Sequence, residues 1–373
     1  MSRAGDALTD RILREGALRF DVAMDMLLYG DGGFFSSGGG AGRQADFVTS
    51  PEIGPLFGTV LARALDEEWE RLGFPDPFVV VEAGAGRGAL AQAVLAATPT
   101  CAPALRYLCV ERSARLRDRL AEGLPVESPA NIFGPILHGE EGEEERPASG
   151  IGPLVAVLDD LPMLPIVGIV LANELLDNLP TRLLERTATG WDELFVGLEG
   201  ELPVAAPSEI AEEADRLAPD ARPGARIPLQ HEALAWVRRA ARSLQRGRLL
   251  LIDYADVTPS LASRSSVDWL RTYRGHARGG GPMDQPGEQD ITCEVAVDQL
   301  SRWRPPDVDR SQAEWLRSHG LDVLVDEARE GWRARAHLGD LEAMKARSRV
   351  SEAEALTDPT GLGAFRVLEW AVG

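Results

Sequence analysis

The sequence predicts an α/β fold in which helices cover a mostly parallel sheet, and three features indicate it. Short apolar runs recur along the chain, and most of them end on an acidic or amide residue. Stretches with apolar residues at helical spacing separate these runs, and a glycine-rich turn joins the first run to one such stretch. Continuous apolar runs are typical of parallel strands because helices bury both faces of the sheet. The runs lie at 78–81, 105–110, 154–158, 166–172 and 249–252.

Composition and charge narrow the class of protein. The 373 residues, 44% of them hydrophobic, suit one large α/β domain with insertions or two domains. A net charge of −20 disfavours nucleic acid, because phosphate binding needs a basic surface, and favours a cationic partner. The three cysteines form no pair with metal-ligand spacing, so we expect no metal, reduced thiols and a cytoplasmic protein. Residues 1–16 do not resemble a signal peptide and no apolar stretch is long enough to span a bilayer, so we expect no membrane insertion.

A largely helical N-terminal segment precedes the first strand. Residues 6–28 carry apolar side chains at helical spacing, and 36–45 are rich in glycine. Ser50 can cap a helix whose first turn holds Pro51, running to about residue 72. From these residues alone, the segment 49–52 is a helix start and nothing more.

The turn after the first strand carries the pattern Glu82-x-Gly84-x-Gly86-x-Gly88. Glycines allow positive φ and let a ligand lie against the backbone, and the following helix N-terminus offers free N–H groups. Gly84, Gly86 and Ala89 also satisfy the loose dinucleotide fingerprint. Three interpretations stay open: S-adenosylmethionine (SAM), a dinucleotide, or a structural turn. Glu82 and Gly88 favour SAM, because this spacing resembles the first motif of class I SAM methyltransferases.

Acidic and amide residues also end the later strands. Glu111 follows 105–110, where a carboxylate can accept hydrogen bonds from ribose hydroxyls. Asp159 ends 154–158 and is either an acceptor for an adenine amino group or a solvated strand end. The strand 166–172 delivers Asn173, Glu174 and Asp177 to the ligand crevice at the carboxyl edge of the sheet.

The remaining sequence predicts additions to this core. Residues 122–152 form an acidic loop, 183–198 one or two strands, and 231–244 an amphipathic helix. Residues 255–290 resemble a loop, either a substrate lid that includes Tyr273 and His276 or an ordinary surface loop. Two helical segments at 311–350 flank a possible strand at 320–326, and 365–371 is the closing strand. Tryptophan and leucine residues in 301–325 could serve a homodimer interface.

Taken in order, these motifs resemble the MidA-like methyltransferases, a family that includes a mitochondrial complex I assembly factor that methylates a protein arginine. The match covers most of the chain and includes Leu28-Tyr29-Gly30, the glycine turn and Val110-Glu111-Arg112-Ser113. Its most specific parts are Asn173-Glu174-x-x-Asp177 and Gln289-Asp290-Ile291-Thr292.

The resemblance implies a Rossmann-like, seven-stranded, mostly parallel sheet with helices on both faces and SAM at its carboxyl edge. It implies four parts: an N-terminal cap at 1–76 that contributes to the cleft, a SAM-binding core at 77–200, an insertion with a helix at 201–246, and the rest of the core at 247–373 with a substrate loop at 271–292. The expected cofactor-binding residues are Thr49, Ser50, Pro51, Glu82, Gly84, Gly86, Gly88, Glu111, Asp159, Asn173 and Glu174.

A SAM-dependent methyltransferase acting on an arginine nitrogen of a protein or peptide is the favoured function. Carboxylates must then hold the guanidinium. The catalytic candidates are Glu174, Asp177 and Asp290, and the substrate-binding candidates are Glu52, Tyr273, His276 and Gln289.

One departure from the family concerns the substrate side. Residues 293–297 stand where the family usually has a His-Val-Asp-Phe-like run. Methylation of a small-molecule or peptide natural product, a SAM-binding assembly factor with little catalysis, and a nicotinamide-dependent oxidoreductase therefore stay as alternatives.

Overall fold

A computed structural model describes residues 2–40, 49–133, 150–275 and 277–373. Its centre is a seven-stranded sheet in the order β16-β17-β10-β5-β2-β3-β4. The five strands from β10 to β4 are parallel, whereas β17 is antiparallel to both β10 and β16. The predicted α/β class with a mostly parallel sheet is confirmed. The strands are β2 (Phe78–Ala83), β3 (Leu105–Val110), β4 (Leu154–Leu158), β5 (Ile166–Asn173), β10 (Leu244–Asp253), β16 (Val308–Ser311) and β17 (Arg366–Val372).

Helices cover both faces of this sheet, and β2 shows why. Phe78 and Val80 pack into the core formed with α4 (Pro55–Arg71) and α5 (Ala89–Ala96). Val79 and Val81 point the other way, into the core formed with α9 (His231–Ser243). Successive side chains of a strand point to opposite faces, so a strand with apolar residues at every position must be buried on both.

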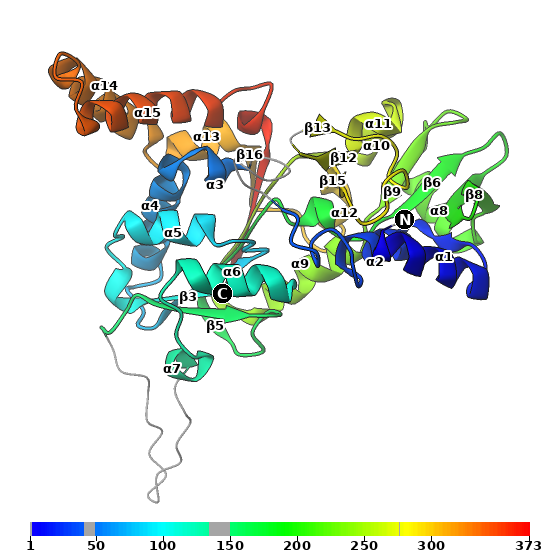
Figure 1. The fold of residues 1–373 in the computed structure, drawn as a ribbon, viewed down its shortest axis with the longest axis horizontal. Helices are drawn as coiled ribbons and strands as arrows, with labels where there is room; N and C mark the ends of the chain where they lie inside the picture. Colours follow the sequence, from blue (N-terminus) through cyan, green and yellow to red (C-terminus); the bar gives the residue numbers. More distant parts are fainter. Residues whose placement is uncertain (1, 41–48, 134–149, 276) are drawn as a thin grey trace, which may run out of the picture.

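A second, smaller lobe contains the N-terminus and residues 182–229. Its sheet has the order β1-β7-β6-β9, with β8 paired to β7. Phe20 and Met24 of α2 pack with Leu183 and Leu194 of this sheet. The pairing of β6 with β9 joins residues on both sides of the predicted boundary at residue 200. Figure 1 shows this lobe at the opposite end of the molecule from the hairpin of α14 and α15. The elements are α1 (Arg3–Glu15), β1 (Leu18–Arg19), α2 (Phe20–Tyr29), β6 (Arg182–Arg186), β7 (Trp191–Gly197), β8 (Gly200–Ala205), α8 (Ser208–Leu217) and β9 (Arg226–Leu229).

Short elements connect the two lobes. Residues 255–290, expected to be loop-like, contain two helical turns and a small sheet in which β12 pairs with β13 and β14. The remaining elements, of which α3, α6 and α7 pack on the main lobe, are α3 (Ser50–Ile53), α6 (Ala114–Gly123), α7 (Pro129–Phe133), β11 (Ala255–Asp256), α10 (Thr258–Ser263), α11 (Ser266–Trp269), β12 (Leu270–Arg274), β13 (Ala277–Arg278), β14 (Asp290–Cys293), β15 (Val295–Ala296) and α12 (Val297–Ser301), with 3₁₀ turns at Ala102–Ala104, Leu176–Asn178 and Leu362–Ala364.

The C-terminal third corrects two expectations. The possible strand at 320–326 is the first part of α14 (Leu321–Arg335), because Leu321, Leu324 and Val325 lie at helical spacing and are buried together. α13 (Gln312–Ser318) places Trp315 in the same core, and α15 (Leu341–Leu356) packs against α14. These buried residues therefore stabilise the fold and are not free to form an interface, and the possible homodimer stays a prediction. No helix in the described part of the chain is both long enough and apolar enough to span a bilayer.

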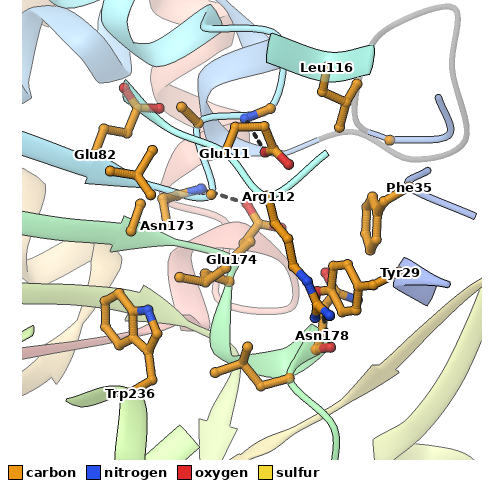
Figure 2. A pocket seen from close by; sticks show the side chains of 18 of the residues that line it. Tyr29, Phe35, Glu82, Glu111, Arg112, Leu116, Asn173, Glu174, Asn178 and Trp236 are labelled. Atoms are coloured by element: carbon orange, nitrogen blue, oxygen red, sulfur yellow. Dashed lines mark hydrogen bonds between the residues drawn. The ribbon is translucent and has the colours of Figure 1, made fainter. Parts of the chain in front are cut away.

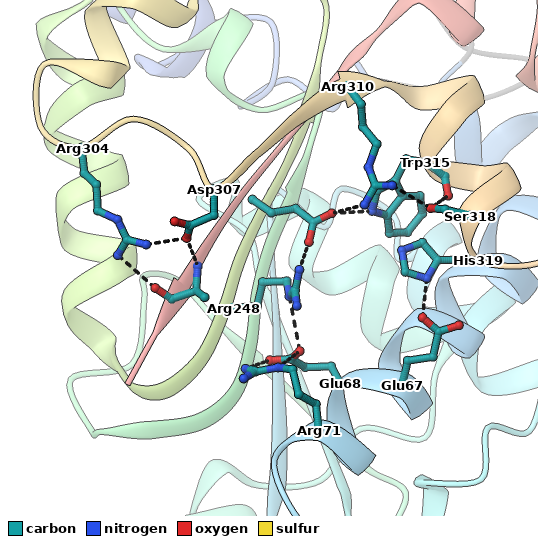
Figure 3. A network of polar contacts seen from close by, with 12 residues as sticks. Glu67, Glu68, Arg71, Arg248, Arg304, Asp307, Arg310, Trp315, Ser318 and His319 are labelled. Carbon is teal, nitrogen blue, oxygen red and sulfur yellow. Dashed lines mark hydrogen bonds and ion pairs between the residues drawn. The ribbon is translucent and has the colours of Figure 1, made fainter.

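A buried ion-pair network fixes the antiparallel edge of the sheet (Figure 3). Glu369 of β17 is 2% exposed and accepts hydrogen bonds from the indole of Trp315 at 2.9 Å and from Arg310 at 3.3 Å. Arg248 of β10 pairs with Glu369 and also contacts Glu68 of α4 at 3.3 Å. The Glu369 carboxylate of β17 is thus linked to three other elements: the helix that contains Trp315, the edge strand β16 and the strand β10.

Replacing Glu369 with Ala is expected to lower the free energy of unfolding by about 2–4 kcal/mol, because it leaves a buried indole N–H without its acceptor and removes one of the two carboxylate partners of Arg248. Urea unfolding at pH 7 measures this loss. Asp309→Asn is the matched control: its ion pair with Arg366 is about 30% exposed on both sides, so its loss should cost less than about 1 kcal/mol. Equal losses for the two variants would contradict the central role of Glu369.

Candidate functional site

A cavity of about 890 Å³ opens at the carboxyl ends of β2, β3, β4 and β5. Parallel strands end at the same edge of a sheet, so the residues just after them meet there. The segments that follow these four strands supply one side of the cavity, and α2 with its following turn supplies the other. The sequence-predicted residues that line it are Thr49, Pro51, Glu52, Glu82, Gly84, Gly86, Glu111, Asp159, Asn173 and Glu174.

The glycine turn lies directly against this cavity. Gly86 has a φ of +55°, and a Cβ there would meet no atom within 4 Å, so its open side faces free space. Gly88 has a φ of +77° but does not line the cavity. A Cβ on Gly88 would approach Leu120 of α6 to 3.1 Å. Gly88 therefore allows the helix α5 to start close to α6, which is a role in packing and not in the cavity wall.

Two buried glutamates support the turn. The Glu82 carboxylate accepts a hydrogen bond from the Tyr107 hydroxyl at 2.7 Å, and burial raises the pKa of Glu82 to about 7 despite that bond. Glu111 accepts hydrogen bonds from the backbone N–H of Gly86 at 3.0 Å and of Ser113 at 2.8 Å. Each oxygen of Glu111 keeps a further lone pair for a ligand. Burial also raises the pKa of Glu111.

Glu174 occupies the centre of the site (Figure 2). Its φ is +52°, an uncommon backbone conformation for a residue with a side chain. Its Oε1 accepts hydrogen bonds from the Ser50 N–H at 3.3 Å and from the Asn173 side-chain amide at 3.1 Å. Removal from water, and secondarily the charge of Asp177, raise the pKa of Glu174 to about 8. The Oδ1 of Asn173 is buried and has no hydrogen-bond partner among the residues that the structure describes, so the pair offers an acceptor beside a carboxyl group.

Three other predicted residues lie behind the cavity. Asp177 is 2% exposed and accepts a hydrogen bond from the Tyr254 hydroxyl. Asp290 is 1% exposed and accepts from the Asn178 amide at 2.8 Å. Neither lines the cavity, so their expected direct contact with a reacting group has no geometric support. Ser50 is fully buried, and its hydroxyl donates to Gln312 at 3.0 Å.

The predicted substrate loop also lies away from the cavity. Tyr273 and Gln289 do not line it, and the Gln289 amide donates to the carbonyl of Gly281 at 2.8 Å. His276 lies outside the described residues. In the described part of the chain, no group of three or more His, Cys, Asp or Glu side chains is arranged to hold a metal ion.

The N-terminal cap at 1–76 was expected to contribute to the cleft, but the residues of α2 that line the cavity were not among the predicted site residues. Asp21, Asp25 and Tyr29 all line it. They are spaced four residues apart, which places them on one face of a helix. This spacing is the sequence feature that could have predicted a shared polar face. Asn178 and Trp236 complete the wall from the other side.

Comparison with known proteins identifies related chains. Residues 60–308 match a family model described as S-adenosyl-L-methionine-dependent methyltransferase. The mitochondrial protein arginine methyltransferase NDUFAF7 of Mus musculus is 29% identical over 317 residues, covering 78% of this chain and 68% of that protein. Its Drosophila melanogaster homolog is 28% identical over 319 residues, covering 77% and 67%. A COG1565 superfamily member from Burkholderia thailandensis, solved with S-adenosyl-homocysteine, has a TM-score of 0.78 at 28% identity and covers 99% of this chain and 91% of its own.

These relatives correct the expected localisation. The curated proteins are mitochondrial, which contradicts the cytoplasmic localisation predicted from the cysteines. The three cysteines are indeed unpaired and buried. Unpaired thiols indicate a reducing environment only, and that criterion does not separate the cytosol from other reducing compartments.

The raised pKa of Glu174 predicts how stability depends on pH. Between its ordinary pKa of 4.5 and about 8, the folded protein keeps a proton on Glu174 that the unfolded chain releases. The folded state then binds more protons, so this contribution to stability is lost as pH rises through that interval. Glu174→Gln does not titrate, so the variant should gain stability relative to the native protein from pH 5 to pH 8. Urea unfolding of both proteins across this range measures the difference, and a constant difference would contradict the raised pKa.

Proposed function

The chain belongs to the family of S-adenosyl-L-methionine-dependent methyltransferases, and from this premise we propose that it methylates an arginine nitrogen of a protein or peptide. The observation that carries the choice of acceptor is the Glu174 carboxyl group inside the cavity. A carboxylate there can hold a guanidinium through two parallel hydrogen bonds. The related proteins named protein arginine methyltransferase support the same acceptor.

The residues of the cavity fit SAM. A ligand with an amino-acid end and vicinal ribose hydroxyls needs donors, acceptors and room beside the backbone. The open side of Gly86, the free lone pairs of Glu111 and the unpartnered Oδ1 of Asn173 meet these needs. We propose that the cofactor is held by Thr49, Pro51, Glu82, Gly84, Gly86, Glu111, Asp159 and Asn173. Ser50 and Gly88, which do not line the cavity, would act through the backbone of the same two segments.

The sulfonium of SAM already makes its methyl group electrophilic. The protein therefore mainly has to position the nucleophile, and positioning is a large source of rate acceleration. Glu174 is the proposed catalytic residue. With a pKa of about 8 it is mostly protonated at pH 7 before an acceptor arrives. A guanidinium cation favours the ionised form, so acceptor binding creates the carboxylate that orients it. A carboxyl group with a pKa near the working pH is also suited to accept a proton from the attacked nitrogen.

Asp177 and Asp290 would contribute indirectly. Asp177 stands three residues after Glu174 and its negative charge helps to raise the pKa of Glu174. Asp290 holds the side chain of Asn178, whose residue lines the cavity. Glu52 also lines the cavity and is proposed to contact the acceptor.

The cofactor assignment predicts stabilisation by SAM and by S-adenosylhomocysteine. At about 100 times the dissociation constant, a ligand of the folded state adds about 2.7 kcal/mol, so the temperature of unfolding should rise with both ligands and not with NAD(H).

The proposed ribose contact of Glu111 predicts a loss of affinity in Glu111→Gln. We expect S-adenosylhomocysteine to bind at least about tenfold more weakly by calorimetry, because the variant loses an acceptor for a ribose hydroxyl and about 1.4 kcal/mol corresponds to a factor of ten. Unchanged affinity would remove Glu111 from the cofactor site.

The role of Glu174 predicts a separation of binding from turnover. In Glu174→Gln, arginine methylation should fall by at least about 100-fold, since the group can no longer become a carboxylate or accept a proton. Its dissociation constant for S-adenosylhomocysteine should stay within about threefold of native, because the amide oxygen can still accept the Ser50 N–H. The control is Asp326→Asn, which removes an exposed carboxylate on α14 that pairs with Arg329 one helical turn further along. Loss of both activities together would make Glu174 a cofactor ligand instead.

A further inference from the structure

We propose that the cavity contains a second guanidinium subsite, formed by Asp25 and Tyr29, that binds an arginine neighbouring the methylated one in the acceptor. This inference rests on the proposed function and specifies the class of acceptor: a segment with two closely spaced arginines. Neither Asp25 nor Tyr29 is among the cofactor-binding or substrate-binding residues that the sequence motifs predict.

The subsite already holds a guanidinium, that of Arg112. The Arg112 Nη1 lies 2.9 Å from the Asp25 Oδ1, and its Cζ lies 4.4 Å from the centroid of the Tyr29 ring. A carboxylate at the edge and an aromatic face are the two contacts that guanidinium groups prefer. Figure 2 shows Arg112 beside Tyr29, in the same cavity as Glu174.

The aromatic part of the subsite is fixed by its surroundings. The Tyr29 ring stacks on Phe35 with centroids 5.4 Å apart, and the Tyr29 hydroxyl donates to the carbonyl of Asn178 at 3.2 Å. The Ser113 hydroxyl donates to the carbonyl of Phe35 at 2.9 Å, which ties this turn to the end of β3. Because these contacts hold the ring in place before a ligand binds, binding costs less conformational entropy, and this favours affinity.

The present occupant, in contrast, is easily displaced. The Arg112 side chain is 58% exposed and that of Asp25 is 42% exposed. Exposed ion pairs contribute little to stability because water competes for both partners. An arginine of a bound acceptor can therefore replace Arg112 and keep both contacts, while Arg112 returns to solvent.

The charges at the rim of the cavity favour the same kind of acceptor. Asp21 and Asp160 also line the cavity, and each pairs with an exposed arginine of this chain: Arg19 at 2.9 Å and Arg239 at 3.3 Å. Both of these carboxylates thus already pair with a guanidinium group. The net charge of −20 attracts cationic segments over a longer range.

The test is calorimetric binding of synthetic peptides to the full chain saturated with S-adenosylhomocysteine. The peptides are of two kinds, four in all: one glycine–serine sequence with a single arginine, and three that carry a second arginine one, two or three residues away. We expect the best two-arginine peptide to bind native protein at least about fivefold more tightly than the single-arginine peptide, as a cation–π contact and a carboxylate contact together allow.

Three variants assign that gain. Asp25→Asn should remove it, and Asp326→Asn, the same change at an exposed ion pair on α14, should leave it intact. Arg112→Ala should raise the affinity of the two-arginine peptide, because the internal competitor is gone. Unfolding curves show whether each variant is folded.

Several outcomes overturn the subsite: equal affinity for the two kinds of peptide, no peptide binding at all to the S-adenosylhomocysteine complex, or a gain that persists in Asp25→Asn. A loss of S-adenosylhomocysteine affinity in Arg112→Ala without a change in peptide affinity would assign Arg112 to the cofactor and also overturn it. Failure of S-adenosylhomocysteine to bind the native protein is a different result, since it contradicts the proposed function itself.

Discussion

The cavity depends on one buried carboxylate, that of Asp253 at the end of β10. Its Oδ2 accepts hydrogen bonds from the backbone N–H of Leu176 at 3.0 Å and of Asp177 at 3.3 Å. These two bonds fix the turn that follows β5, and the Glu174 N–H donates to the carbonyl of Ile252 at 2.8 Å just before it. The turn would otherwise relax, because the positive φ of Glu174 costs free energy for a residue with a Cβ. The position of the central carboxyl group is therefore set by a strand nearly 80 residues further along the chain.

The same arrangement explains the charge state of the site. Burial, then the charges of Asp177 and Glu174, raise the pKa of Asp253 well above its usual range. Burial likewise raises the pKa of Asp177. Carboxyl groups this close cannot all ionise without a cation. The proposed guanidinium acceptor would supply positive charge beside this acidic cluster, so the raised pKa values and the proposed acceptor would have one physical origin.

Much of the cofactor side could be predicted from the sequence. Chain order and the apolar runs determine which residues follow parallel strands, and such residues must meet at one edge; Glu82, Gly86, Glu111, Asp159 and Glu174 all do so. The direction of each side chain within a turn was not predictable in this way. Asp177 lies three residues after Glu174, but the 3₁₀ turn at Leu176–Asn178 directs it toward Tyr254. Asp25 and Tyr29 were not among the predicted site residues, because nothing local links a helix at 20–29 to strands after residue 78.

The packing of the N-terminus has a consequence for biosynthesis. β1 pairs with β7, and α2 packs against β6 and β7, about 160 residues later. The apolar face of α2, with Phe20, Met24 and Leu27, can pack with α1 early, but its partners in β6 and β7 are missing until the ribosome has completed the chain beyond residue 197. Contacts between distant segments form late and leave apolar surface open in the meantime. The side of the cavity that α2 provides is thus assembled after translation of the glycine turn. A truncated chain that ends before β7 would contain the glycine motif but would lack a complete cleft.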